Sequence, residues 1–109
     1  MKDMIEYLRE FDKKRMWNHY DEAKTPEEKL EVLQKQIVSL LGEFGEFANL
    51  VKKYRRDGTW YPEKLKEEVT DMFIFLLKIT QTLEMDLEEE FYKKMKINEE
   101  RFKDFIKGD

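Results

Sequence analysis

The organisation of this chain follows from residues 41–48, LGEFGEFA, and from a second segment further along, residues 67–72, EEVTDM. Each segment places two acidic residues three positions apart in an otherwise apolar run; they are Glu43 and Glu46 in the first, Glu68 and Asp71 in the second. An ionised carboxylate in apolar surroundings is unfavourable unless it is paired or bound to a metal. Two such pairs on neighbouring helices would form a cage of four carboxylates.

The composition favours a single all-α domain covering residues 1–109. Charged residues make up 42% of the chain and hydrophobic residues 40%, with only four Gly and two Pro. This balance, poor in residues that interrupt helices, is typical of an all-helical protein. A chain of 109 residues is long enough for one modest core and too short for two.

The residue types present restrict the kind of metal site the chain can build. The sequence has no Cys and a single His, His19. Thiolate sites and histidine-rich sites are therefore excluded. Any bound metal would be held by oxygen atoms, which favours Mg²⁺, with Mn²⁺ as a substitute.

The charge and the apolar runs restrict the partners. A net charge of −4 argues against binding to a nucleic-acid polymer, because affinity for the phosphate backbone needs a basic face. The longest apolar run, residues 72–77, is far too short to span a bilayer. The N-terminus lacks the apolar segment of a signal peptide. We therefore expect a cytoplasmic protein that contacts no membrane.

Apolar periodicity predicts four helices, over about residues 3–20, 26–56, 62–84 and 87–106. Thr25, Pro26 and Glu28 form a helix-start signature, in which Thr25 caps, Pro26 takes the first position and Glu28 completes a capping box. Asp86 is the expected cap of the fourth helix, and Gly108 is its expected end.

The third predicted helix is apolar on almost every side at residues 73–77, FIFLL. A helix that is hydrophobic all round is buried on all sides. One small chain has too little material to cover it, so we expect a homodimer or homotetramer. The core positions expected on the fourth helix are Phe91, Met95, Phe102 and either Phe105 or Ile106.

Two further features have both a structural and a functional explanation. Gly42 and Gly45 each cost about 1 kcal/mol relative to Ala inside a helix. They therefore suggest that something approaches this backbone closely, either a packed helix or a ligand. Trp17 can pack on the core at the end of the first helix, or it can form a pocket wall on which a flat ligand stacks.

The two acidic pairs are expected to meet across a helical hairpin. The midpoint of the first pair lies about 17 Å before the turn and that of the second about 11 Å after it. The difference is about one helical turn, which long Glu side chains can span. Four carboxylates at one place repel each other unless a cation neutralises them. An all-oxygen cage suits Mg²⁺ and hence phosphoryl or nucleotidyl chemistry.

The alternative is that these acids are ordinary residues on helix edges that pair with Lys. A set of polar residues on the fourth predicted helix helps to decide between a metal site and ordinary surface acids. Lys94, Asn98 and Arg101 share one face of the fourth helix by their spacing of four and three. Such a face can simply be solvated, or it can neutralise a polyphosphate bound at the carboxylates.

The acidic segments and the last predicted helix resemble those of a known family. Glu43-x-x-Glu46, then 21 residues, then Glu68-x-x-Asp71 is similar to the ExxE–ExxD signature of the MazG-like all-α nucleoside triphosphate pyrophosphohydrolases. Residues 94–102, KMKINEERF, resemble the phosphate-contacting motif on the last helix of these enzymes. The segment holding Phe11, Arg15, Trp17 and Tyr20 resembles the dCTP pyrophosphatase branch.

The resemblance implies a four-helix protomer, a homodimer or tetramer, and hydrolysis of a nucleoside triphosphate to the monophosphate and pyrophosphate. It implies Mg²⁺ held by Glu43, Glu46, Glu68 and Asp71, with Glu43 or Glu46 orienting or deprotonating the attacking water. The remaining implied contacts are Lys94, Asn98 and Arg101 to phosphate, and Trp17 and Tyr20 to the base and sugar. Removal of surplus or non-canonical nucleotides is the implied role.

The sequence also departs from that branch. Asp21 stands where a pocket His is expected, and Lys53 where a Trp is expected, so the preferred base stays open. The phosphoribosyl-ATP pyrophosphohydrolases share the expected fold, but their signature fits less well. A different class of function is a helical module that has kept the fold and binds a nucleotide or a protein without cleaving it.

Overall fold

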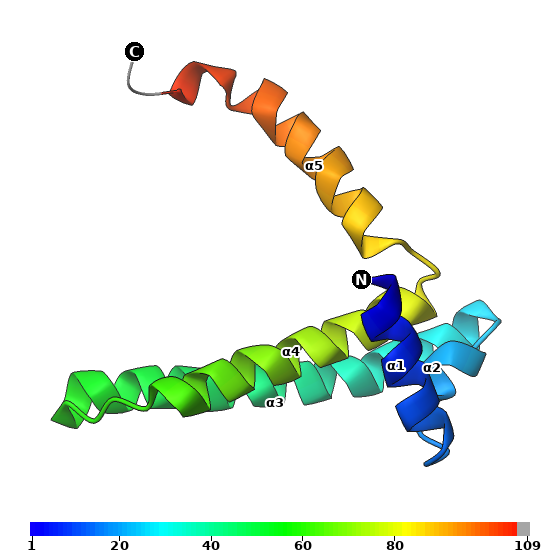
Figure 1. Cartoon of the computed structure of the whole chain (residues 1–109), viewed down its shortest axis with the longest axis horizontal. Helices are drawn as coiled ribbons and strands as arrows, with labels where there is room; N and C mark the ends of the chain where they lie inside the picture. The colour runs from blue at the N-terminus through cyan, green and yellow to red at the C-terminus, as the bar shows by residue number, and fades with distance from the viewer. Residues whose placement is uncertain (107–109) are drawn as a thin grey trace.

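The computed structural model describes residues 1–106, which form an all-α structure without a strand (Figure 1). The all-α prediction is confirmed. The elements, in order, are α1 (Lys2–Lys13), α2 (His19–Glu22), α3 (Pro26–Asp57), α4 (Pro62–Thr82), α5 (Leu87–Arg101) and the 3₁₀ turn η1 (Lys103–Phe105).

The body of the molecule is an antiparallel hairpin of α3 and α4, and its two helices begin where the sequence predicts. The predicted capping box is present at the start of α3: Thr25 Oγ1 accepts from the Glu28 N–H, and Glu28 accepts from the Thr25 N–H. At the other end Gly58 adopts φ 75°, and its N–H donates to the carbonyl of Tyr54. This left-handed cap stops α3 and returns the chain into α4 after four residues.

The predicted first helix is wrong in its second half. It ends at Lys13, and the chain turns before α2, so the protomer has five α-helices in residues 1–106 where four were expected. Met16 takes a positive φ of 59°, which no helix can accommodate. The backbone carbonyl of Asp12 accepts from the N–H groups of both Arg15 and Trp17, which closes this turn.

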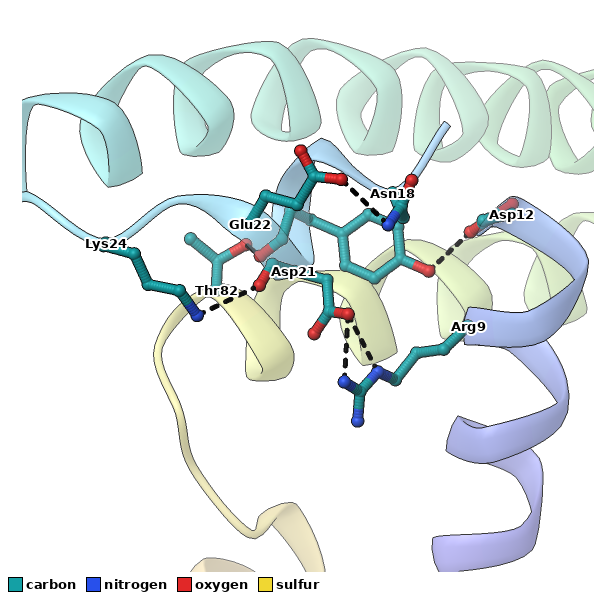
Figure 2. Close-up of polar contacts among 8 residues, drawn as sticks. Arg9, Asp12, Asn18, Asp21, Glu22, Lys24 and Thr82 are labelled. Atoms are coloured by element: carbon teal, nitrogen blue, oxygen red, sulfur yellow. Dashed lines mark hydrogen bonds and ion pairs between the residues drawn. The ribbon is translucent and has the colours of Figure 1, made fainter. Parts of the chain in front are cut away.

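A buried polar cluster anchors α1 and α2 on α4. Asp12 is only 1% exposed, and its carboxylate accepts a 2.6 Å hydrogen bond from the Tyr20 hydroxyl and lies 3.5 Å from the Lys78 ammonium. The Thr82 hydroxyl donates to the backbone carbonyl of Tyr20. Figure 2 shows Asp12 and Thr82 on two sides of α2, with an outer ion pair between Arg9 and α2. Burial and the Asp12 carboxylate both raise the pKa of Tyr20, so its hydroxyl keeps its proton.

The last helix begins as predicted but does not join the body. Asp86 caps it by accepting from the Glu89 N–H. α5 ends at Arg101, earlier than the predicted residue 106, and expected Gly108 lies outside the described residues. Figure 1 shows α5 leaving the end of α4 and projecting away from the hairpin. The core positions predicted on it are wrong, because each is exposed by 40% or more: Phe91, Met95, Phe102, Phe105 and Ile106.

The shape is open for a chain of this size. Its radius of gyration is 17.7 Å, against about 13 Å for a compact domain of the same length. Its accessible surface is 9130 Å², against about 6,500 Å² for a folded monomer of this mass. Among residues 1–106, the only apolar residues that are buried are Tyr20, Ala23 and Leu77. The described part of the chain therefore lacks a core of ordinary size.

Large apolar side chains are correspondingly exposed along the hairpin and α5. On α3 and α4 they include Leu30, Ile37, Val38, Leu41, Phe44, Val51, Val69 and Leu76. The prediction that residues 73–77 are buried on all sides does not hold within one chain, where only Leu77 is buried. Among residues 1–106, none of the helices has the length and apolar character needed to cross a membrane.

The Asp12 cluster generates a test of how the N-terminal segment is held. Tyr20→Phe removes the hydroxyl that donates to the buried carboxylate, so we expect the free energy of unfolding to fall by about 1.5–3 kcal/mol. Urea unfolding at a fixed protein concentration measures it. Tyr7→Phe is the matched control, because Tyr7 is 77% exposed and should unfold like the wild type. Equal unfolding midpoints for the two variants would contradict the anchoring role.

Candidate metal centre

The hairpin brings acidic residues from both sequence segments together. Glu43 of α3 and Glu68 and Asp71 of α4 each offer a carboxylate oxygen, and these oxygens all lie within 4.8 Å of one another. Glu68 and Asp71 lie about one turn apart on α4, and Glu43 lies opposite them on α3. The difference of about one turn estimated from the sequence is absorbed by the long glutamate side chains and by the packing of the two helices.

Glu46 lies at the edge of this group. It is not among the three residues whose oxygens meet within 4.8 Å, yet its carboxyl group is close enough to Glu68 to raise that residue's pKa. The spacing of three residues puts it about one turn from Glu43 on α3. We refer to Glu43, Glu46, Glu68 and Asp71 together as the carboxylate cluster.

The carboxylate cluster has no cation of its own in the described part of the chain. None of the ion pairs formed there involves any of the four acids. One oxygen of Glu43 and one of Glu68 are also shielded from solvent without a hydrogen-bond partner. Ordinary pairing with Lys, the alternative raised by the sequence, is therefore not what these residues do within residues 1–106. An oxygen that is buried and unpaired is unfavourable unless something fills its coordination.

The proximity of the acids changes the titration of one of them. The pKa of Glu68 is raised from 4.5 to about 7, chiefly by the carboxyl group of Glu43 beside it and next by desolvation. The nearby carboxyl of Glu46 adds to the effect. Near neutral pH Glu68 of the metal-free protein is therefore partly protonated, and a bound cation would displace that proton.

The two glycines beside the cluster face open space. A Cβ added at Gly42 or Gly45 would meet no atom within 4 Å. The close approach expected from their positions is therefore absent within one chain. The face of α3 that carries them is uncovered, together with Leu41 and Phe44.

The predicted phosphate-binding residues are not brought to the cluster. Lys94, Asn98 and Arg101 lie on α5, which projects away from α3 and α4 (Figure 1). The Arg101 guanidinium sits 4.9 Å from the centre of the Phe102 ring, on its own segment. Within one chain, therefore, the predicted phosphate-binding residues lie apart from the carboxylate cluster, although the sequence predicted that they meet.

Trp17 and Tyr20, the residues predicted to contact the base and sugar, line one cavity but differ in solvent exposure. Trp17 is 58% exposed, whereas Tyr20 is 3% exposed and donates its hydroxyl to Asp12. Tyr20 therefore offers a ring wall and no polar group. Asp21, at the position where a pocket His was expected, forms an ion pair with Arg9 at 3.0 Å.

Sequence reasoning missed the other residues of that cavity. They are His19, Val32, Lys35, Gln36, Ser39, Phe75 and Lys78. A signal was present, because Gln36 lies two turns before Glu43 and Phe75 one turn after Asp71. Each is on the same helix face as an acid already selected.

The raised pKa of Glu68 generates a test on the metal-free protein. Between pH 4.5 and about 7 the folded state keeps a proton that the unfolded chain has lost. The stabilising contribution of Glu68 is therefore full below pH 4.5 and disappears as the pH rises through 7. Glu68→Gln removes this dependence. We expect the stability of wild type, measured by thermal unfolding with a chelator present, to fall relative to Glu68→Gln between pH 5 and 8.

The neighbouring Glu67→Gln is the matched control, because Glu67 is exposed. Its melting temperature should follow that of wild type across the same range. Parallel curves for wild type and Glu68→Gln would contradict the raised pKa.

Comparison with known proteins gives no independent assignment. No protein-family model matches the chain, and neither a curated protein nor a solved structure is matched by it. A function is therefore inferred from the residues and their geometry.

Proposed function

We propose that the protein is a Mg²⁺-dependent nucleoside triphosphate pyrophosphohydrolase, which converts a nucleoside triphosphate and water to the monophosphate and pyrophosphate. The observation that carries the proposal is the carboxylate cluster. Acids from two helices converge there, and within residues 1–106 they have no cationic partner and leave two buried oxygens without hydrogen bonds. The resemblance to the MazG-like ExxE–ExxD signature supports the same activity.

The cluster suits Mg²⁺ in its donor chemistry. Its atoms are all carboxylate oxygens from Glu43, Glu46, Glu68 and Asp71, the hard ligands that this ion prefers. Mn²⁺ takes the same oxygen ligands and should substitute. When bound, the metal supplies charge neutralisation and polarises a phosphoryl oxygen. The unpaired oxygens of Glu43 and Glu68 are the ones left to take up such a ligand.

The chain's own residues then hold water and substrate. Glu43 or Glu46 orients a water molecule and accepts its proton as the water oxygen bonds to the α-phosphorus. The bond from that phosphorus to the bridging oxygen breaks, and pyrophosphate leaves. Cationic side chains are needed for the triphosphate charge, and Lys94 and Arg101, with the amide of Asn98, are suited to this.

We also propose that the working unit is a homodimer or homotetramer. The isolated chain exposes about 2,600 Å² more surface than a compact monomer of its mass. Over two chains this is about 5,200 Å², at the upper end of what obligate homodimers bury. An apolar groove of ≈640 Å³ between α1 and α4, lined by Met4, Leu8, Phe11 and Phe73 among others, is uncovered. The face of α3 beside Gly42 and Gly45 is uncovered as well.

Assembly offers a way to complete the site. α5 carries the candidate phosphate-binding residues, exposes apolar side chains, and projects away from the α3–α4 hairpin of its own chain. In the proposed oligomer, α5 of one copy packs on the hairpin of another, so that Lys94, Asn98 and Arg101 reach a carboxylate cluster in trans. The same packing covers Phe91 and Met95.

The catalytic proposal is tested by neutralising single acids. We expect Asp71→Asn and Glu46→Gln each to lower pyrophosphate release by about 100-fold or more, because each removes a ligand of the charge-neutralising metal. The helical circular dichroism should not change. Glu67→Gln, next to the cluster but exposed, is the control and should keep wild-type turnover. Full activity in both cluster variants would refute the assignment.

The trans arrangement is tested by mixing two inactive variants. Asp71→Asn lacks a metal ligand, and Arg101→Ala lacks a phosphate contact. If α5 acts in trans, a mixed dimer contains one site with both defects and one with neither. Unfolding and refolding the two variants together should then restore up to about half of the wild-type rate per mixed dimer. A mixture no more active than its components would show that each site is built from one chain.

The assembly itself is tested by sedimentation. The chain has a mass of 13.5 kDa, and we expect a particle of two or four times this mass, with a melting temperature that rises with protein concentration. A monomer at micromolar concentration would contradict the proposed oligomer.

The alternative is a non-catalytic module, which the large exposed apolar surface favours on its own. Thermal unfolding separates the two. Stabilisation by Mg²⁺ together with a nucleotide, but with no monophosphate formed from any triphosphate in a broad panel, would indicate a binding module.

A further inference from the structure

We propose that Gln36 recognises a ligand by hydrogen bonding in a cavity that holds a single planar heterocycle. The ring of this ligand carries a hydrogen-bond donor next to an acceptor. In the proposed function this ring is the base of the nucleoside triphosphate, and the identification of the ligand depends on that function. The amide of Gln36 is the recognition group, and the rings of Trp17 and Phe75 are the walls.

The cavity lies where α2, α3 and α4 meet. Its volume is ≈160 Å³, below the roughly 300–1,000 Å³ of sites for drug-sized ligands. The cavity therefore has the size of a group of one or two rings. Trp17 is more than half exposed and so has ring surface free for stacking, and stacking a base on an aromatic ring is worth about 1–3 kcal/mol.

Gln36 is the polar group in this cavity that the fold leaves unsatisfied. It is 7% exposed, and its Oε1 atom is buried without a hydrogen-bond partner within residues 1–106. A buried amide oxygen without a donor is unfavourable. Two other polar groups of this cavity are already engaged: the Tyr20 hydroxyl donates to Asp12, and the Lys78 ammonium pairs with the same carboxylate.

The chemistry of the amide defines the ligand. A Gln side chain presents one acceptor and one donor side by side. It therefore matches a ring edge with the complementary pair, as Gln does when it contacts a base in two places. The Lys78 ammonium, which lines the same cavity, is balanced by the Asp12 carboxylate and is not needed to pair with the ligand.

The position of the cavity fits a nucleotide. Gln36 lies two turns from Glu43 on α3, about 10 Å along the axis. Phe75 lies one turn from Asp71 on α4, about 6 Å along its axis in the same direction, because the helices are antiparallel. The cavity and the carboxylate cluster thus share one side of the hairpin. Their separation leaves room for a sugar between a bound base and a metal-bound phosphate.

The test uses nucleosides, which have no phosphate and so probe the cavity without the metal centre. Cytidine, uridine, adenosine and guanosine are titrated separately into the full-length protein, and the side-chain amide and indole NMR resonances are followed. We expect at least one nucleoside to shift the resonances of Gln36 and Trp17. Gln36→Leu should weaken that binding by 10-fold or more, because the ligand's polar edge loses its partner.

The matched control is Gln34→Leu, an exposed glutamine on the same helix, which should bind like wild type. Gln36→Glu keeps an acceptor and loses the donor, so it should change the order of preference among the four nucleosides. This second variant serves if Gln36→Leu fails to fold. Unchanged affinity and order in both variants, or no nucleoside shifting Gln36 in the wild type, overturns the proposal.

Glu43→Gln separates this proposal from the catalytic one. It should abolish hydrolysis and leave nucleoside binding intact. Nucleoside binding through Gln36 in a protein that hydrolyses no triphosphate would retain the cavity and reject the enzyme. Hydrolysis that is insensitive to Gln36 substitution, in both rate and base preference, would retain the enzyme and reject the role of Gln36.

Discussion

The register between α3 and α4 is the constraint on which the candidate site depends. It is set at the turn, where Gly58 ends α3 in a left-handed conformation and Pro62 starts α4. The edge-to-face contact of Tyr54 and Trp60, with ring centres 5.5 Å apart, packs across the same turn. A residue inserted within α4 between Pro62 and Glu68 would rotate Glu68 by about 100° about the helix axis. Glu68 would then no longer face Glu43.

This register holds like charges together, so the hairpin gives up stability at the cluster. Its unpaired oxygens and the raised pKa of Glu68 are signs of that conflict. Natural sequences accept such local conflicts mainly where a ligand or partner relieves them. The same reasoning applies to Gln36, which is buried with an unmatched acceptor. The two conflicts lie along one side of the hairpin, and each is relieved by a different part of one nucleotide in the proposed function.

Local signals were sufficient to predict much of the fold from the sequence. The capping box at Thr25, the turn at Gly58 and the cap at Asp86 each depend on residues a few positions apart, so the helix starts were predicted correctly. The meeting of Glu43 with Glu68 and Asp71 followed from helix geometry and a short connection. These features need no knowledge of the rest of the chain.

Features set by tertiary context were not predictable in this way. The break at Met16 depends on Asp12, whose side chain is held by Tyr20 and Lys78. The periodicity of α5 indicated an apolar face correctly, but a pattern cannot say which chain covers that face. For the same reason Lys94, Asn98 and Arg101 were placed beside the carboxylates, from which α5 departs. Gln36 shares a helix face with Glu43, but the sequence alone does not show that its amide oxygen is buried without a partner within residues 1–106, so it was passed over.

The dominance of the α3–α4 hairpin also has a kinetic consequence. Most contacts between elements of the chain join these two helices, which are close in sequence, and contacts of this kind form quickly because little loop entropy opposes them. The hairpin can therefore form within a chain soon after synthesis. In the proposed oligomer, the covering of its apolar faces must await an encounter with a second chain. That step is second order, so at low expression the chain spends longest in the form with its apolar surface open to aggregation.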